Sequence, residues 1–165
     1  MTATHANPQP TFRIEQVATS AHVKAAHDLF VEYANSLGFS LCFQNFDHEL
    51  RTLPGDYAPP RGRLLLAYLN DAPVGCVALH HFEDDACEMK RLYVRPSARG
   101  HGLGRVLVER LIREARAIGY KSMRLDTVEP IMTHAVLLYR DMGFEEILAY
   151  RENPQQGTLY FELKL

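Results

Sequence analysis

The sequence predicts a layered α/β domain, and three features support that prediction. Strand-like and helix-like segments alternate along the chain, which is typical of a sheet covered by helices rather than of a helical bundle or a β-sandwich. A strand, a glycine-rich turn and a helix follow one another between residues 87 and 118. The 165 residues, of which 47% are hydrophobic, are enough to bury one core, so we expect a single domain.

Hydrophobic spacing predicts the individual elements. Alternating or short apolar runs predict strands at 12–17, 64–69, 74–82, 87–94, 123–127, 144–150 and 159–164. Apolar residues at helical spacing predict helices at 21–37, 44–53, 102–118 and 135–142. The second and third strands are expected to form one hairpin, and the last two strands another. The strand–helix–strand unit over 87–127 predicts that its two strands run parallel.

Composition and charge narrow the classes of function. The net charge of -2, from 18 basic and 20 acidic residues, is unlike that of a nucleic-acid-binding domain, so small molecules are the expected ligands. The three cysteines form no CxxC pair, which favours a reducing cytoplasm. No apolar run approaches the roughly 20 residues that cross a bilayer, so we expect a soluble protein that does not contact membranes. We expect residues 1–10 to form a disordered tail and residues 11–165 to form the folded domain.

The turn Arg99-Gly100-His101-Gly102-Leu103-Gly104 is the candidate ligand site. Three glycines at alternate positions let the backbone approach a ligand, and amides at a helix start favour phosphate. A plain tight turn is the alternative. A Rossmann site with Asp126 as the ribose-binding acid is disfavoured, because the third glycine is one position early and hairpin strands precede the loop. A Walker loop would need Gly-Lys-Ser/Thr, which is missing.

Two motifs resemble those of the GNAT superfamily of acyl-CoA-dependent N-acetyltransferases. Leu92-Tyr93-Val94-x-Pro96 with Arg99-x-x-Gly102-x-Gly104 resembles the acyl-CoA-binding motif, and Ala135-x-x-Leu138-Tyr139-x-x-x-Gly143-Phe144 resembles the next motif of that family. Their order and context extend the resemblance over 11–165. The resemblance implies a mixed, mostly antiparallel, twisted sheet of about six to seven strands, splayed in the middle and flanked by about four helices. It also implies direct transfer of the acetyl group of acetyl-CoA to a primary amine of a small molecule or peptide.

The resemblance further implies roles for particular residues. The acetyl-CoA-binding residues would be Leu92, Tyr93, Val94, Arg99, Gly100, His101, Gly102, Leu103, Gly104, Arg105, Thr127 and Met132. Many members of the family have an asparagine at the position of Met132. Pantetheine would insert where strands 87–94 and 123–127 separate, with strand amides holding the thioester carbonyl. Tyr139 would protonate or stabilise the departing thiolate. Glu88, 11 residues before Arg99, is either the general base or a strand carboxylate paired with Lys90 or Arg91.

Several other features carry weaker expectations. The pairs His80-His81 and His22/His27 point to different directions on a strand or helix, so we expect no metal site. The acidic run 83–85 could favour a cationic acceptor, although such a run at a hairpin tip is usually solvated. A non-catalytic acyl-CoA sensor is one alternative function, and a nicotinamide-dependent oxidoreductase is another. The resemblance also allows a homodimer, and the amine acceptor is not identified by the sequence.

Overall fold

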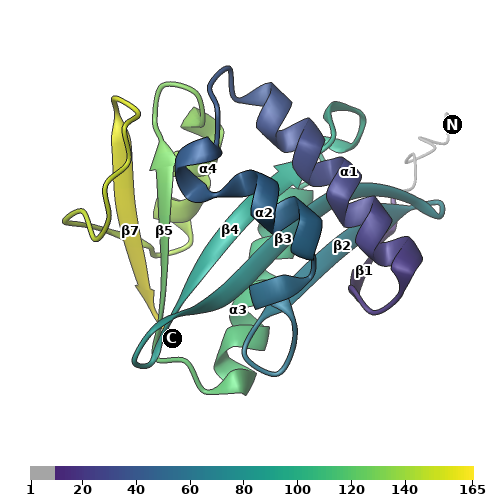
Figure 1. Ribbon diagram of the computed structural model, residues 1–165, viewed down its shortest axis with the longest axis horizontal. Helices are drawn as coiled ribbons and strands as arrows, with labels where there is room; N and C mark the ends of the chain where they lie inside the picture. The colour runs from purple at the N-terminus through teal and green to yellow at the C-terminus, as the bar shows by residue number, and fades with distance from the viewer. Residues whose placement is uncertain (1–9) are drawn as a thin grey trace, which may run out of the picture.

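The computed structural model describes residues 10–165, in which a seven-stranded sheet lies between two layers of helices (Figure 1). The predicted tail, apart from Pro10, lies outside the described residues. The strands are β1 (Phe12–Gln16), β2 (Arg63–Leu69), β3 (Ala72–Glu83), β4 (Ala86–Val94), β5 (Ser122–Val128), β6 (Glu145–Ile147) and β7 (Thr158–Lys164). The helices are α1 (Ser20–Ser36), α2 (Phe46–Thr52), α3 (Leu103–Ile118) and α4 (Thr133–Asp141), with 3₁₀ turns η1 (Cys42–Gln44), η2 (Gly55–Tyr57) and η3 (Pro96–Ala98).

The strand order β1-β2-β3-β4-β5-β7-β6 gives a mixed sheet. Neighbouring strands are antiparallel except β4 and β5, which α3 connects as a parallel pair. The predicted mixed, mostly antiparallel fold is therefore confirmed, and the predicted parallel arrangement holds for this one pair. The two predicted hairpins are also present, since β2 pairs with β3 and β6 pairs with β7.

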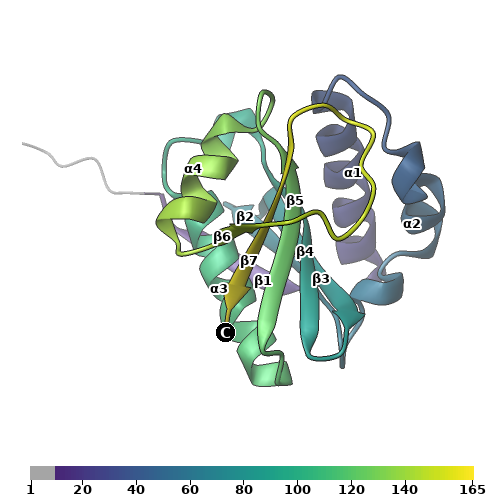
Figure 2. The same ribbon diagram turned by 90° about the vertical axis from the view of Figure 1, so that its left-hand side faces the viewer.

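One predicted strand is much shorter than expected. The spacing predicts a strand over 144–150, but β6 ends at Ile147. The Tyr150 ring packs edge-on against Phe82 and Tyr160, with ring centroids 5.1 Å apart in each pair. To make these contacts the chain leaves the sheet after β6, and the connection over 148–157 passes the β7 edge to the side of the sheet on which α1 and α2 lie (Figure 2). The prediction was wrong here because long-range packing outweighs the local apolar pattern.

Hydrophobic side chains fill the space on both faces of the sheet. Figure 2 shows α1 and α2 on one side of the strands and α3 and α4 on the other. Along β2, Leu64 and Leu66 belong to the core beneath α1 and α2, whereas Leu65 belongs to the core beneath α3 and α4. Central strands buried on both faces read as continuous apolar runs, as β2 does. This rigid sheet positions the residues of the site.

The sheet opens between β4 and β5. Ladder pairing joins these strands only over Ala86–Glu88 and Ser122–Arg124, and beyond this point they separate. In the part of β4 that no longer pairs with β5, there is a β-bulge against β3: Arg91 and Leu92 together lie opposite Val77. The φ angle of Arg91 is 60°. A bulge leaves one residue out of the ladder and bends its strand. The predicted splay in the middle of the sheet is thus confirmed.

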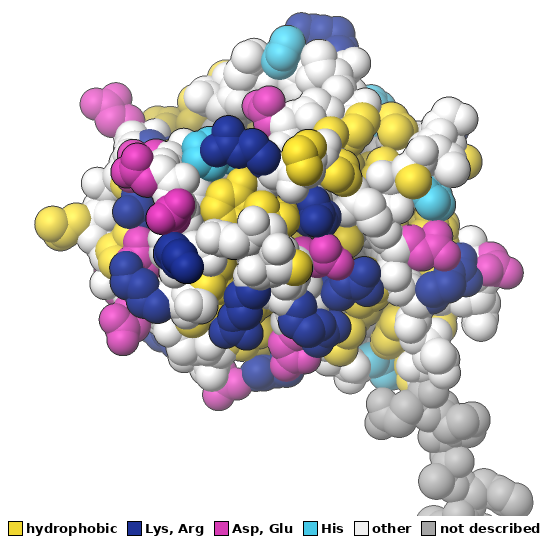
Figure 3. Space-filling view, turned by 90° about the horizontal axis from the view of Figure 1, so that it is seen from below, with side chains coloured by type: hydrophobic (Ala, Val, Ile, Leu, Met, Phe, Trp, Pro, Cys, Tyr) yellow, Lys and Arg dark blue, Asp and Glu magenta, His cyan; other side chains and the backbone are white. Residues whose placement is uncertain are grey.

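The molecular surface shows mixed charges. On the face drawn in Figure 3, Lys and Arg side chains are intermixed with Asp and Glu side chains, in keeping with the net charge of -2. Within residues 10–165, no helix has the length and apolar character required to traverse a bilayer.

Candidate active site

A cavity of about 780 Å³ lies where β4 and β5 separate. Its walls come from the end of α1, β4, the loop before α3, β5 and α4. The predicted residues that line it are Leu92, Tyr93, Val94, Arg99, Gly100, Gly102, Leu103, Gly104, Arg105, Thr127, Met132 and Tyr139. His101 is not among them, because its ring lies beside Phe12 of β1 at a centroid distance of 6.3 Å. The structure therefore brings together, around one cavity, Tyr139 and all of the predicted acetyl-CoA-binding residues except His101.

The glycine-rich loop presents the start of α3 to this cavity. Gly102 is the N-cap, with a φ angle of 75°, and Gly100 has a φ angle of 85°, so both occupy the left-handed region that favours glycine. A Cβ atom at either position would meet nothing within 4 Å. The amide of Val106 donates to the Gly102 carbonyl at 3.2 Å, which leaves the preceding helix amides without intrahelical partners. Open space, amide donors and the positive helix end fit a pyrophosphate.

Two arginines flank the loop. The Arg99 Nε donates to the carbonyl of Val94 at 2.9 Å, which ties the loop back to the end of β4. Arg105 forms an ion pair with Asp141 of α4. Both residues line the cavity beside the start of α3 and add positive charge there.

A buried ion pair fixes the bulge in β4. The Arg91 guanidinium, 2% exposed, donates to Glu49 of α2 through Nε at 2.8 Å and Nη2 at 3.1 Å. The Tyr57 hydroxyl donates to the same carboxylate at 2.8 Å. Burial opposes the positive charge of Arg91, but the hydrogen bonds to Glu49 outweigh it and raise the pKa of the guanidinium. Glu49 thereby stabilises the bulge, at which the pairing between β3 and β4 is interrupted beside the cavity.

Tyr139 extends from α4 into the same cavity. Its ring packs against Phe144 and Phe161, at centroid distances of 5.6 and 6.4 Å, and the residue is 5% exposed. Its hydroxyl makes no hydrogen bond to another residue in the range 10–165. Burial, reinforced by the negative charge on neighbouring groups, raises the pKa of this phenol. The hydroxyl therefore remains protonated at neutral pH and is able to donate a proton or a hydrogen bond.

Glu88, the candidate base, is completely buried and lines neither cavity. Its carboxylate accepts hydrogen bonds from His80 Nε2 at 2.9 Å, from the Tyr150 hydroxyl at 2.7 Å and from Arg151. Burial opposes ionisation, but the His80 hydrogen bond and the charges of Lys90 and Arg151 outweigh it and lower the pKa of Glu88 to about 2. Such a carboxylate is a weak base at neutral pH. The geometry therefore favours a positioning role and does not support proton acceptance by Glu88.

The Glu88→Gln variant tests this interpretation through stability. A carboxyl group whose pKa falls from 4.5 to about 2 on folding stabilises the protein above about pH 5 and loses that effect toward pH 2. We expect Glu88→Gln to lower the free energy of unfolding at pH 7 by about 3 kcal/mol, with a smaller loss at about pH 3. Denaturant unfolding at both pH values measures this, with the exposed Glu109→Gln as control. A loss that is equal at both pH values would contradict the ionised role.

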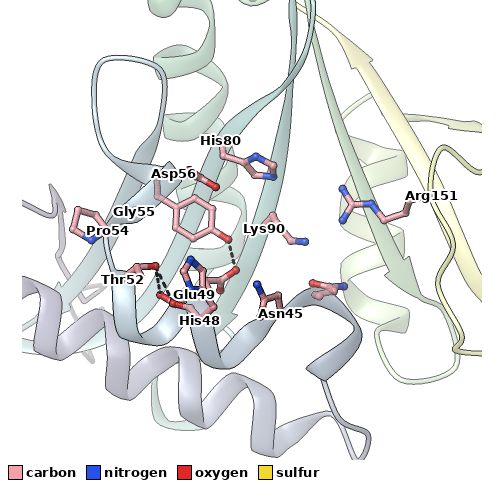
Figure 4. Close-up of a pocket in the computed structure, with 12 residues that line it drawn as sticks. Asn45, His48, Glu49, Thr52, Pro54, Gly55, Asp56, His80, Lys90 and Arg151 are labelled. Carbon is pink, nitrogen blue, oxygen red and sulfur yellow. Dashed lines mark hydrogen bonds between the residues drawn. The ribbon is translucent and has the colours of Figure 1, made fainter.

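A second cavity, of about 480 Å³, adjoins the first on the α2 side (Figure 4). Residues of α2, η2, β3 and β4 line it together with Arg151, which comes from the connection between β6 and β7. Gln44 and Lys90 line both cavities, so the two spaces meet there. Tyr57 contributes to its wall, whereas Phe39 and Phe43 line the larger cavity and Phe46 belongs to the core.

Sequence reasoning missed Asp126 and Asn153 as residues of the larger cavity. Asn153 Nδ2 donates to Asp126 Oδ2 at 3.3 Å, across the gap between β5 and the connection before β7. The sequence suggests Asp126 only for a dinucleotide site, although its place beside Thr127, on a strand that borders the splay, is a usable signal. The connection that supplies Asn153 carries no motif, so no local signal could have found it.

Of the other candidate residues, His80 lines the second cavity. His80 and His81 point to opposite faces of β3, since His80 contacts Glu88 while His81 stacks on Tyr120 at 6.0 Å. Within residues 10–165 there is no group of three or more His, Cys, Asp or Glu side chains arranged to hold a metal ion. The acidic run 83–85 closes the turn between β3 and β4 and lines neither cavity.

Comparison with known proteins places this site in a family. The model of the acetyltransferase (GNAT) family matches residues 23–144. An uncharacterized N-acetyltransferase of Schizosaccharomyces pombe is 42% identical over 139 residues, which cover 83% of this chain and 85% of that protein. A GNAT-family acetyltransferase of Staphylococcus aureus Mu50 has a similar fold, with a TM-score of 0.78 at 16% identity, covering 93% of this chain and 99% of that one. A Salmonella typhimurium protein, solved with its cofactor acetyl-CoA, gives a TM-score of 0.65 at 18% identity over 93% of each chain.

These findings agree with the geometry of the site. A nicotinamide-binding Rossmann sheet is mostly parallel, whereas this sheet has one parallel pair, so the oxidoreductase alternative is not supported. The GNAT family uses acetyl-CoA, and the helix start and open sheet described above fit that molecule. The chain therefore belongs to the GNAT acetyltransferase family and is an N-acetyltransferase whose acetyl transfer depends on acyl-CoA.

Proposed function

We propose that this protein transfers the acetyl group of acetyl-CoA directly to a primary amine of a small molecule. The observation that carries the proposal is the larger cavity, which joins the start of α3, the bulge in β4 and Tyr139 in one space. The size of this cavity is within the range of about 300–1,000 Å³ that is usual for sites of small molecules and cofactors.

Each part of the cavity has a proposed task. Acetyl-CoA supplies the acetyl group as a thioester. The amides of residues 99–105, with Arg99 and Arg105, bind its pyrophosphate, and Thr127 and Met132 contact the pantetheine arm. Backbone amides near Leu92 and Val94, beside the bulge, donate hydrogen bonds to the thioester carbonyl and stabilise the negative charge that develops there. Tyr139 donates a proton or hydrogen bond to the departing thiolate.

We propose Asp126, rather than Glu88, as the group that accepts the proton of the amine. Asp126 lines the larger cavity, is half-buried and accepts one hydrogen bond, from Asn153, whereas the Glu88 carboxylate is occupied by three donors. Arg124 and Asp126 alternate with Met123 and Leu125 along β5, and the latter two point into the core beneath α3. Asp126 therefore faces the side of the sheet on which α2 and the second cavity lie.

Calorimetry and a thiol-release assay test the proposed function. We expect acetyl-CoA to bind and NAD not to bind, and we expect thiol release with at least one amine from a panel of amino acids, polyamines, other small amines and peptides. Binding of acetyl-CoA without thiol release on any amine would favour the acyl-CoA sensor and overturn the proposal. Size-exclusion chromatography of the same protein tests the homodimer, and fractionation of cells tests the cytoplasmic location.

The Gly102→Ala variant tests the pyrophosphate site. The φ angle of Gly102 is 75°, so an added Cβ atom strains the backbone there and enters the open space above the helix amides. We expect the affinity for acetyl-CoA, measured by calorimetry, to fall about tenfold or more. The matched control is Gly119→Ala at the other end of α3, where φ is 109° and a Cβ atom also meets nothing within 4 Å. Equal affinity losses in the two variants would argue against the site.

A further inference from the structure

The second cavity contains two cations with unused hydrogen-bonding capacity. Lys90 of β4 and Arg151 extend toward each other from opposite sides (Figure 4). The Lys90 side chain is 9% exposed, and its Nζ atom lies 3.8 Å from Glu88 Oε1, beyond hydrogen-bond distance. Arg151 donates to Glu88 through Nη2, but its Nε is buried and has no hydrogen-bond partner. Buried polar groups normally have partners, so the unpartnered Nε of Arg151, beside the Lys90 ammonium, points to a ligand.

The charges around this pair leave a positive excess. One carboxylate, that of Glu88, faces Lys90, Arg151 and His80. His80 Nε2 lies 2.9 Å from Glu88 Oε1, and His80 Nδ1 lies 2.7 Å from the His81 carbonyl oxygen. Lys90 and Arg151 alone outnumber this one carboxylate.

The other acidic groups near the cavity do not cancel this excess. Glu49 is occupied by Arg91 and Tyr57. Asp56 is exposed at the rim, and Asp126 lines the larger cavity but not this one. The interior of the second cavity therefore favours an anion.

We propose that the second cavity binds a carboxylate of the acceptor molecule, so that the acceptor is a small amine that also carries a carboxylate, as amino acids do. This inference rests on the proposed function. Lys90 and Gln44 line both cavities, so a molecule whose carboxylate lies between Lys90 and Arg151 can extend its amine toward Asp126 at the splay. Arg151 and Lys90 would then be specificity-determining residues, and Glu88 would hold them in position.

The same charges disfavour a cationic acceptor such as a polyamine. A second ammonium group in this cavity would lie beside Lys90 and Arg151, where like charges repel in a poorly solvated space. Burial lowers the pKa of Lys90, despite the opposing influence of Glu88, and a carboxylate ligand would offset that penalty. The acidic run 83–85, which could have favoured a cationic acceptor, lies at the turn between β3 and β4 and lines neither cavity.

Matched pairs of acceptors test this inference. Thiol release is measured with the common L-amino acids and with the C-terminal amide of each, which keeps the amine and side chain but removes the carboxylate. We expect kcat/KM for the best amino acid to exceed that for its amide by about tenfold or more. Thiol release is also measured with acidic peptides whose C-termini are blocked, as a separate class of acceptor. A preference for the amides, for polyamines or for the peptides would overturn the inference while leaving acetyl transfer intact.

Variants of Lys90 and Arg151 test whether the preference for amino acids over their amides arises in the second cavity. We expect Lys90→Gln and Arg151→Gln each to reduce the ratio of kcat/KM between amino acid and amide about tenfold. Lys90→Gln is the cleaner variant, because Arg151 also binds Glu88. The control is Arg124→Gln, since Arg124 pairs with Glu83 and Glu162 and lines neither cavity. An unchanged ratio in both cavity variants would contradict the inference.

Direct binding separates this inference from the proposed function. Calorimetry with N-acetyl amino acids, titrated into the protein in the presence of CoA, requires no turnover. We expect these acids to bind at least about tenfold more tightly than their amides, with the difference lost in Lys90→Gln. Failure of acetyl transfer with every amine would overturn the proposed function, whereas equal binding of acids and amides would overturn the carboxylate site alone.

Discussion

Replacement of Tyr139 by Phe is expected to lower kcat about 100-fold or more, with the affinity for acetyl-CoA nearly unchanged. The variant keeps the ring that packs against Phe144 and Phe161 and removes only the hydroxyl group. A phenol whose pKa is raised by burial remains protonated, so it can assist the thiolate to leave, and phenylalanine cannot. Thiol release under saturating conditions measures kcat, and calorimetry measures the affinity.

The control for this experiment is Tyr68→Phe. Tyr68 lies on β2, is 9% exposed, has the Arg13 guanidinium 4.8 Å from its ring centroid, and lines neither cavity. Its replacement removes the same hydroxyl group at a distance from the site and should leave kcat within about twofold. If Tyr139→Phe turns over as fast as Tyr68→Phe, then Tyr139 has a packing role only.

Replacement of Asp126 by Asn is expected to reduce kcat/KM for the amine about 100-fold at neutral pH, because the carboxylate that accepts the ammonium proton is lost. Asparagine is nearly isosteric and can still accept the hydrogen bond from Asn153. The loss should shrink as the pH approaches the pKa of the free amine, because an amine that is already deprotonated needs no base. The pH profile of thiol release measures this recovery.

Two comparisons make the Asp126 prediction specific. Asp85→Asn removes an exposed carboxylate at the turn between β3 and β4, and it should leave the profile unchanged. Glu88→Gln should lower the free energy of unfolding but leave the shape of the pH profile nearly unchanged, because Glu88 lines neither cavity. If Glu88→Gln instead shows the pH-dependent recovery and Asp126→Asn does not, Glu88 is the base after all.

The sequence alone determined the glycine-rich loop and the start of α3. Apolar periodicity over 102–118 and the glycines before it are local properties, and they form α3 with its amides free at the start. The two motifs lie on short segments whose conformations depend mainly on neighbouring residues. Most of the predicted site residues therefore line the larger cavity, and Tyr139 lies on its predicted helix.

The tertiary structure alone decided the environment of Glu88 and the lining of the second cavity. Tyr150 and Arg151, which bind Glu88, lie 62 and 63 residues further along the chain, and Glu49 lies 42 residues before Arg91. Burial and charge interactions depend on which distant segments meet in space, so local spacing could not reveal that Glu88 is fully engaged. For the same reason β6 ended early, and the second cavity, which long-range folding assembles from several segments, had no signature in the sequence.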